Sequence, residues 1–474
     1  MGSTSSRAYA GRFPDVGRLA LVLGGTLAGA ALAAGEAGLE VAAGLATDGA
    51  GGAGAGGAEA HAAKKSGKGS QRTMDSEAIR RHAPRAMTRE HCGITGFDSF
   101  HFVVENLDRS RRFYTEVLDF KEVAKAGPEL VERSGQQSVV FGAGDARVCV
   151  STPLTQRSKA ARYLKVHPAG VMSLSFTTDD LDKTADFLDK RGGTFLSEPL
   201  EVKNADGSTY RSFEIATPLG DVAFRFVERK GGFKGFAPGF LDVADGHASK
   251  PKNCFGIHDV DHVTSNGLTM QPIIAWYRDV LGFEPFWEIS FHTRDVAAER
   301  ASGSGLRSIV MWHPESGVKF ATNEPLRPFF RESQIAKFVE DNVGNGVQHV
   351  AFAVDDILTT VPDLERRGVE FMKTPKSYYE DLPERLAKLG INNVKAALDE
   401  LEKKQILVDG AHDKYMLQIF MREASGMYDD RRAGPFFYEI IQRCGDEGFG
   451  YGNFRALFES IERAQKKAAG AAAS

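Results

Sequence analysis

Residues 170–176 read GVMSLSF and residues 346–352 read GVQHVAF, so the two stretches match at an offset of 176. Each is followed by an Asp-Asp pair, an amphipathic segment that ends at an Arg-Gly pair, and a proline. The alternating apolar residues predict a strand, and the acidic pair predicts the start of a helix that ends near the glycine. Because self-similarity at a constant spacing indicates a duplicated unit, these stretches predict two related domains.

A second pair of stretches supports the duplication. Residues 100–103 read FHFV and residues 261–264 read DHVT, and each stretch leads to an aromatic pair and then an apolar segment. We therefore expect two homologous domains of two βα-type modules each. The first is expected over residues 95–230 and the second over residues 255–467, joined by a Gly-, Pro- and Lys-rich linker at residues 231–254.

The second domain is the longer copy. Its additions are a segment from Lys376 to Leu407 and a helix expected from about Phe454 to Lys467. All three tryptophans of the chain also lie in this copy. The two copies are therefore related but not equivalent.

The first 81 residues differ in composition from the rest of the chain. Of the 51 glycines, 17 fall within residues 1–70, where only two aromatic residues occur. Such a Gly- and Ala-rich segment buries too little apolar surface to offset the entropy of ordering it, so we expect disorder. Two alternatives also fit: arginines before the apolar stretch at residues 19–34 suit a signal or transit peptide, and Met74 and Met87 suit an over-long reading frame.

The overall composition narrows the class of partner. The chain has 474 residues, of which 42% are hydrophobic and 26% charged, and its formal net charge is −4. This composition is typical of a globular protein and lacks the basic field that nucleic acid or an anionic membrane requires, so we expect a small-molecule partner. The four cysteines are far apart and form no C-x-x-C pattern, which argues against a disulfide framework and favours a reducing, cytoplasmic location.

The two copies differ at strand positions that suit metal chemistry. His262 is matched by a histidine in the first copy, whereas His349 and Glu439 are matched by Ser173 and Arg225. Two imidazoles and one carboxylate suit a divalent first-row metal, with Fe(II), zinc and manganese all compatible. Glu439 also interrupts an apolar run, where an unpaired buried carboxylate would be costly. The alternative is a pair of hydrogen-bonded strand histidines and a glutamate that points to solvent.

Ordered motifs in the second half of the chain carry a resemblance to a known family. They are DHV at 261–263, NEP at 323–325, SQI at 333–335, GVQH at 346–349, ILVD at 406–409, LQIF at 417–420, FYEIIQR at 437–443, GFG at 448–450 and GNF at 452–454. On these motifs the chain, from about residue 96 to residue 465, resembles the vicinal oxygen chelate superfamily and, within it, the 4-hydroxyphenylpyruvate dioxygenase family. The resemblance implies an α+β fold of two tandem domains, each of two βαβββ modules that form an open half-barrel, plus a C-terminal helix.

The resemblance also implies a cofactor, a reaction and a set of site residues. The cofactor is Fe2+ held by His262, His349 and Glu439, and the reaction is the conversion of a 2-oxo acid, 4-hydroxyphenylpyruvate, and O2 into homogentisate in tyrosine and phenylalanine catabolism. The implied catalytic residues are Gln334, Gln348, Gln418 and Asn453, and the implied substrate-binding residues are Ser308, Asn323, Phe420, Phe437, Phe449 and Phe454. The family further implies a homodimer or homotetramer.

Three other functions are open on the sequence. Hydroxymandelate synthase uses the same substrate and metal but hydroxylates the benzylic carbon, and Phe454 argues against it because that enzyme carries a smaller aliphatic residue there. A relative acting on another aryl or aliphatic 2-oxo acid also fits. From a different class, a non-catalytic binding protein of the same fold fits the first domain better than the second, which alone keeps the three candidate ligands.

Overall fold

The computed structural model describes residues 90–243, 253–292, 305–326, 333–450 and 452–454. The leader expected over residues 1–81 and the C-terminal helix expected beyond Phe454 lie outside the described residues. Within the described ranges, no helix combines the length and the apolar character that crossing a membrane would require.

In the part of the chain that the structure describes, the first sheet contains nine strands. They are β1 (Ile94–Val103), β2 (Lys121–Ala126), β3 (Gln136–Ala143), β4 (Ala146–Pro153), β5 (Gly170–Thr178), β6 (Leu200–Lys203), β7 (Thr209–Ile215), β8 (Ala223–Lys230) and β9 (Phe240–Asp242). Their order across the sheet is β6-β7-β8-β5-β1-β4-β3-β2-β9. Strand β9 lies inside the segment expected to be a linker and pairs antiparallel with β2.

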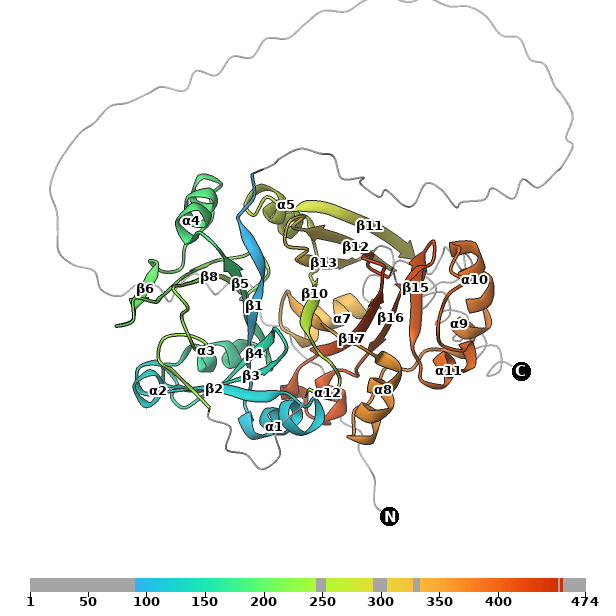
Figure 1. Cartoon of the computed structure of the whole chain (residues 1–474), viewed down its shortest axis with the longest axis horizontal. Coiled ribbons are helices and arrows are strands. Elements are labelled where there is room, and N and C mark those ends of the chain that lie inside the picture. Colours follow the sequence, from blue (N-terminus) through green and yellow to red (C-terminus); the bar gives the residue numbers. More distant parts are fainter. Residues whose placement is uncertain (1–89, 244–252, 293–304, 327–332, 451, 455–474) are drawn as a thin grey trace, which may run out of the picture. The chain divides into compact units, whose positions relative to one another are not determined.

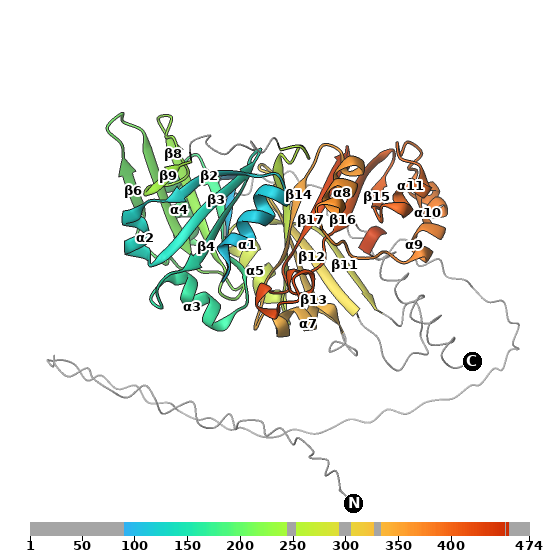
Figure 2. The same cartoon turned by 90° about the horizontal axis from the view of Figure 1, so that it is seen from below.

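The second sheet contains eight strands among the described residues. They are β10 (Asp259–Asn266), β11 (Glu284–His292), β12 (Gly305–Trp312), β13 (Lys319–Pro325), β14 (Gly346–Ala353), β15 (Leu407–Ala411), β16 (Lys414–Phe420) and β17 (Phe437–Cys444). Their order is β11-β12-β13-β10-β14-β17-β16-β15. In Figure 1 and Figure 2, strands β1 to β9 lie on one side and strands β10 to β17 on the other.

The two sheets share one topology, which confirms the predicted duplication. Strand β1 pairs antiparallel with β5 and parallel with β4, and β10 pairs in the same way with β14 and β13. Strands β5 and β14 then pair parallel with β8 and β17, where Ser175 lies opposite Arg225 and Ala351 opposite Glu439. Each domain is therefore a curled half-barrel of mixed strands, and Glu439 and Arg225 occupy equivalent positions.

The helices begin and end where the repeat predicts. Helix α4 (Leu181–Lys190) begins after Asp180, whose side chain accepts a hydrogen bond from a backbone N–H of the first turn, and α8 (Ile357–Arg366) begins after Asp356 in the same way. Gly192 and Gly368 follow these helices with φ of +80° and +91°, a conformation that favours glycine. The other α-helices within the described residues are α1 (Leu107–Arg112), α2 (Pro128–Ser134), α3 (Lys159–Val166), α5 (Gln271–Asp279), α7 (Gln334–Asp341), α9 (Lys376–Glu380), α10 (Leu382–Leu389), α11 (Leu398–Lys403) and α12 (Ala424–Met427).

Helices α9, α10 and α11 belong to the second domain alone. The first domain connects α4 to β6 through residues 191–199, whereas the second connects α8 to β15 through residues 367–406. Figure 1 places the three helices beside β15, and α10 contacts that strand. The added segment therefore lies at the edge of the second sheet.

Strand β17 is buried on both faces, which explains its apolar run. Side chains alternate along a strand, so Tyr438 points away from Glu439. The Tyr438 hydroxyl lies 2.5 Å from that of Tyr114 in the first domain, and the Tyr438 ring stacks on Phe352 with centroids 4.8 Å apart. One face of β17 thus packs against the first domain while the other carries Glu439.

Candidate active site

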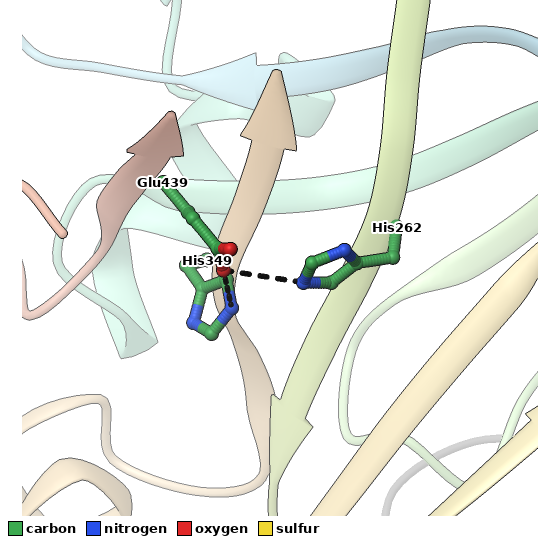
Figure 3. A group of neighbouring side chains, drawn as sticks. All are labelled: His262, His349 and Glu439. Atoms are coloured by element: carbon green, nitrogen blue, oxygen red, sulfur yellow. Dashed lines mark ion pairs between the residues drawn. The ribbon is translucent and has the colours of Figure 1, made fainter. Parts of the chain in front are cut away.

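Three neighbouring strands bring the candidate metal ligands together. His262 lies on β10, His349 on β14 and Glu439 on β17, and all three side chains are buried. Glu439 Oε2 lies 3.2 Å from His262 Nε2 and 3.3 Å from His349 Nε2. Figure 3 shows both imidazoles directed at the carboxylate. One ligand atom from each residue fits within 4.8 Å of the others, so residues 87 and 90 positions apart in the sequence form one cluster.

Burial and mutual attraction set the charges of this cluster. Burial disfavours the imidazolium, but Glu439 and Asp261 raise the pKa of His262 above its ordinary value. For His349, burial prevails over the attraction of Glu439 and lowers the pKa. Burial also disfavours the carboxylate, yet the two histidines lower the pKa of Glu439. The cluster therefore combines an anionic carboxylate with two imidazoles, of which His262 is the more readily protonated.

Both imidazoles present Nε2 to the carboxylate because Nδ1 has another partner. His262 Nδ1 lies 2.7 Å from Asp261 Oδ1, and His349 Nδ1 lies 3.1 Å from Gln348 Oε1. Each of these oxygens can only accept, so Nδ1 carries the proton and the lone pair of Nε2 is available to a metal. An oxygen acceptor behind a ligating histidine is the usual arrangement in metal sites.

A buried oxygen supports the presence of a metal. Glu439 Oε1 has no hydrogen-bond partner within the described part of the chain. Leaving a charged oxygen buried and unpaired costs several kcal/mol, whereas a cation bound by the two Nε2 atoms and the carboxylate would satisfy it. The donor set therefore fits a divalent metal, and the solvent-facing alternative for Glu439 is excluded by its 2% exposure.

An ion pair between Arg443 and Asp261 supports His262, because Asp261 is the residue that accepts from His262 Nδ1. Arg443 Nη2 donates to Asp261 Oδ1 at 2.6 Å, and Arg443 Nη1 donates to the carbonyls of Asp446 and Gly448 at 2.9 Å each. Burial opposes ionisation of Asp261, but Arg443 and His262 hold the pKa of Asp261 well below its ordinary value. Arg443 thereby connects a candidate metal ligand to the turn that precedes Phe449.

A cavity of about 270 Å3 opens beside His349, near the lower end of the ~300–1,000 Å3 typical of small-molecule sites. Seven of the residues implied by the family resemblance line it: Gln334, Gln348, Gln418, Phe420, Phe437, Asn453 and Phe454. The Phe437 ring stacks on His349 with centroids 4.9 Å apart. Phe449 packs instead on His262, with centroids 4.2 Å apart. The cavity is therefore an aromatic and amide-lined space beside the candidate metal centre.

Ser308 and Asn323 are not among the residues that line this cavity. They lie opposite each other on β12 and β13, and Asn323 Nδ2 donates to Asn266 Oδ1 on β10 at 2.9 Å. Ser308 Oγ, Asn323 Oδ1, Asn266 Nδ2 and Thr264 Oγ1 are buried without a partner among the residues described. Such a group of unsatisfied atoms calls for water or a ligand. Thr264 and Asn266 were not predicted from the sequence, although the alternation of side chains along β10 from His262 could have indicated them.

The equivalent positions of the first domain form an ordinary hydrogen-bonded interior. His101 Nε2 lies 2.6 Å from Ser151 Oγ, and Arg225 Nη2 donates to Ser212 Oγ at 3.2 Å. Burial lowers the pKa of His101 to about 4, so this imidazole is neutral. Among the residues that the structure describes, only the second domain holds a metal-ligand cluster of three.

The turn formed by residues 448–450 and 452–454 packs closely on β15 and β16. Gly452 N–H donates to Asp409 Oδ2 at 2.7 Å. A Cβ added to Gly452 would lie 2.5 Å from Asp409 Oδ1, and one added to Gly450, whose φ is +71°, would lie 2.7 Å from Gln418 Oε1. These glycines allow the turn to approach the strands, which brings Phe449 and Asn453 to the site.

We expect the substitution Asp409→Asn to stabilise the protein above about pH 6. Burial raises the pKa of Asp409 from 3.8 to about 6, so folding favours the protonated carboxyl. The corresponding stability is present in full below about pH 4 and is lost as the pH rises through about 6, with a maximum of about 3 kcal/mol. Urea unfolding between about pH 5 and pH 8 should show a gap between variant and wild type that widens with pH. A variant that is less stable at every pH would contradict this expectation.

Fold and site together define a class of protein. A family model described as the Glyoxalase/Bleomycin resistance protein/Dioxygenase superfamily matches residues 96–220 and residues 259–383, once in each domain. The chain therefore belongs to this superfamily.

Curated relatives narrow the class of protein further. The 4-hydroxyphenylpyruvate dioxygenase of Dictyostelium discoideum is 34% identical over 377 residues, which cover 79% of this chain and 99% of the relative. The corresponding protein of Caenorhabditis elegans is 35% identical over 380 residues, or 79% of this chain and 93% of the relative. The chain is a member of the 4-hydroxyphenylpyruvate dioxygenase family and thus a dioxygenase.

Solved structures agree with the fold. A mutant of 4-hydroxymandelate synthase from Streptomyces coelicolor superposes with a TM-score of 0.61 at 25% identity, covering 79% of this chain and 99% of that one. A fusion of a xylose isomerase-like TIM barrel with 4-hydroxyphenylpyruvate dioxygenase superposes with a TM-score of 0.54 at 16% identity, covering 78% of this chain and 53% of that one. The second likeness concerns the fold alone.

Proposed function

We propose that the protein is an Fe(II)-dependent 4-hydroxyphenylpyruvate dioxygenase, which converts 4-hydroxyphenylpyruvate and O2 into homogentisate and CO2 in tyrosine and phenylalanine breakdown. The observation that carries the proposal is the buried cluster of His262, His349 and Glu439 beside an aromatic cavity. Relatives that match along nearly their whole length bear the name of this enzyme.

Iron suits the proposed reaction better than the other metals compatible with the ligands. Two histidines and one carboxylate with open positions are the ligand set typical of non-heme Fe(II) oxygenases. Bound iron supplies the one-electron chemistry that activates O2, and zinc has no such redox chemistry. The protein contributes two neutral Nε2 donors and the Glu439 carboxylate, whose single negative charge leaves the site net cationic toward an anionic 2-oxo acid.

The remaining residues of the cavity orient the substrate and exclude water. The rings of Phe420, Phe437 and Phe454 provide apolar walls suited to an aromatic ring. The amides of Gln348 and Gln418 can donate hydrogen bonds to substrate oxygens without the negative charge that would compete for a metal. In this proposal the chain holds the ring and the 2-oxo acid in one orientation, and water is kept from the reacting centre.

Hydroxymandelate synthase is the second candidate, because a mutant of such an enzyme superposes on this chain at 25% identity. The higher identity to named 4-hydroxyphenylpyruvate dioxygenases favours the first candidate. The test is to incubate the Fe(II)-loaded protein with 4-hydroxyphenylpyruvate and O2 and to identify the product by chromatography and mass spectrometry. We expect homogentisate. A 4-hydroxymandelate product would replace the first candidate by the second, and oxygen uptake only with other 2-oxo acids would refute both.

We also propose a cytoplasmic location and a homodimeric or homotetrameric state. All four cysteines are free thiols, which fits a reducing compartment. The oligomeric state rests on the family resemblance. Subcellular fractionation and light scattering of the purified protein test the two proposals separately.

A further inference from the structure

The helical segment found only in the second domain contacts the C-terminal turn of the active site. Tyr378 on α9 and Arg385 on α10 both reach Asn453, and Asp409 on β15 reaches the adjacent Gly452. Asn453 and Tyr378 are each 1% exposed. A segment without counterpart in the first domain therefore meets a residue that lines the catalytic cavity.

The hydrogen bonds of Tyr378 determine how the Asn453 amide is oriented. The Tyr378 hydroxyl accepts from the Val408 N–H at 2.9 Å and from Arg385 Nη2 at 2.6 Å. Neither donor can act as an acceptor, so both lone pairs of the hydroxyl are used and its single proton must be donated. The nearest acceptor is the Asn453 side-chain atom at 2.5 Å, compared with the Val408 carbonyl at 3.2 Å. That Asn453 atom must therefore be the oxygen, because an NH2 group in its place would face only hydrogen-bond donors, the Tyr378 hydroxyl and Arg385 Nη2.

Arg385 strengthens this orientation. Its Nη2 also lies 3.4 Å from Asn453 Oδ1, and its guanidinium stacks over the Tyr378 ring at 4.4 Å from the ring centroid. Burial raises the pKa of Tyr378 despite the nearby cation, so the hydroxyl keeps the proton that it donates. A cation and a protonated hydroxyl thus both favour the oxygen of the amide on their side.

The backbone beside Asn453 is held from two directions. Gly452 N–H donates to Asp409 Oδ2 at 2.7 Å, and the Gly452 carbonyl accepts from Arg385 Nη1 at 3.2 Å. The amide and the peptide that carries it are therefore fixed by the same group of residues.

The NH2 end of the Asn453 amide carries two N–H donors but meets no acceptor among the described residues. Asn453 Nδ2 is buried and has no hydrogen-bond partner among the described residues. Asn453 lines the cavity that also contains Gln348, Gln418 and Phe437. Two buried N–H groups without a partner are costly, so this end of the amide suits a ligand oxygen.

We infer that Tyr378 and Arg385 are positioning residues, which fix the Asn453 amide so that its NH2 group donates a hydrogen bond to an acceptor oxygen of the 2-oxo acid substrate. The identity of that substrate rests on the proposed function. The role of the added helices α9, α10 and α11 is then to orient Asn453, a substrate-binding group for which the first domain has no counterpart.

A double-mutant cycle with a matched control tests the inference. Tyr378→Phe removes the hydroxyl that bonds Asn453, whereas Tyr379→Phe removes a neighbouring buried hydroxyl that donates to the Ile406 carbonyl at 3.3 Å. We expect Tyr378→Phe to lower kcat/KM for 4-hydroxyphenylpyruvate about tenfold, read as oxygen uptake, and Tyr379→Phe to stay within about twofold of wild type. In an Asn453→Ala background, Tyr378→Phe should have almost no further effect, because it acts through Asn453. A purely structural role would produce equal losses in both backgrounds and would overturn the inference.

A second measurement needs no substrate. Hydrogen exchange of the amides of residues 448–450 and 452–454 should become faster in Tyr378→Phe and stay unchanged in Tyr379→Phe, since only Tyr378→Phe loses a hydrogen bond to the turn. Unchanged exchange in Tyr378→Phe would overturn the positioning role. If wild-type protein does not turn over 4-hydroxyphenylpyruvate, the proposed function fails, and hydrogen exchange still decides the inference.

Discussion

Replacing His349 by alanine is expected to abolish both metal retention and turnover. The substitution removes one of two neutral donors and leaves the buried Glu439 carboxylate with a single histidine beside it. Loss of a residue that merely supports a ligand typically lowers metal affinity or activity 10- to 100-fold, so loss of the ligand itself should exceed about a hundredfold. Iron content after gel filtration and oxygen uptake with 4-hydroxyphenylpyruvate measure the two effects.

The first domain supplies a matched control for this experiment. His101 is the counterpart of His262, is a partly buried strand histidine, and bonds Ser151 rather than a carboxylate. We expect His101→Ala to lose some stability while its iron content per folded protein stays that of the wild type. Full iron content and activity in His349→Ala would refute the ligand assignment, and loss of iron in both variants would indicate a folding defect instead.

Replacing Arg443 by methionine is expected to cause the largest loss of stability among single substitutions near the site. The change leaves the Asp261 carboxylate, 8% exposed, without its cation, and it also removes two bonds to the turn at Asp446 and Gly448. Breaking one partner of a buried ion pair costs about 3–5 kcal/mol. Because Asp261 holds the Nδ1 proton of His262, iron affinity should also fall about 10- to 100-fold. Urea unfolding and metal titration measure the two quantities.

A second substitution separates charge from packing. In the double variant Asp261→Asn with Arg443→Met, the buried negative charge is absent, so we expect a substantial part of the lost stability to return. The side-chain amide introduced by Asp261→Asn keeps a carbonyl oxygen that can accept from His262, so part of the iron affinity should return as well. No recovery of either quantity would show that the lost bonds to the turn, and not the unpaired charge, account for the defect.

The repeat made most of the fold predictable. Alternation and the acidic pairs predicted strands β5 and β14 and helices α4 and α8, because these features depend on local sequence. Comparison of the two copies also indicated the three candidate ligands, since equivalent strand positions keep equivalent places in a duplicated sheet. Strand β9 was missed, because three residues in a segment rich in glycine carry no periodicity.

The contacts around the ligands could not be predicted from local patterns. Asp261 meets Arg443 across 182 positions, and Tyr378 meets Asn453 across 75. Each pair depends on the register of a sheet and the docking of a short helix, which no spacing in the sequence encodes. For the same reason, the resemblance implied Ser308 and Asn323 as substrate-binding residues without indicating that they are not among the residues lining the cavity beside His349.

The first domain, although it holds no ligand cluster within the described chain, lies directly behind strand β17. The Tyr114 hydroxyl hydrogen-bonds to that of Tyr438, and the Phe113 ring stacks on the Tyr438 ring with centroids 6.0 Å apart. Tyr438 is the residue directly before Glu439. A shortened gene that encoded only the second copy would retain every proposed ligand yet expose this aromatic surface to water. The first domain thus covers an apolar face of the second, and this packing gives selection a reason to keep it although its described residues hold no ligand cluster. A minimal version of the enzyme would have to redesign that surface before the first copy could be removed.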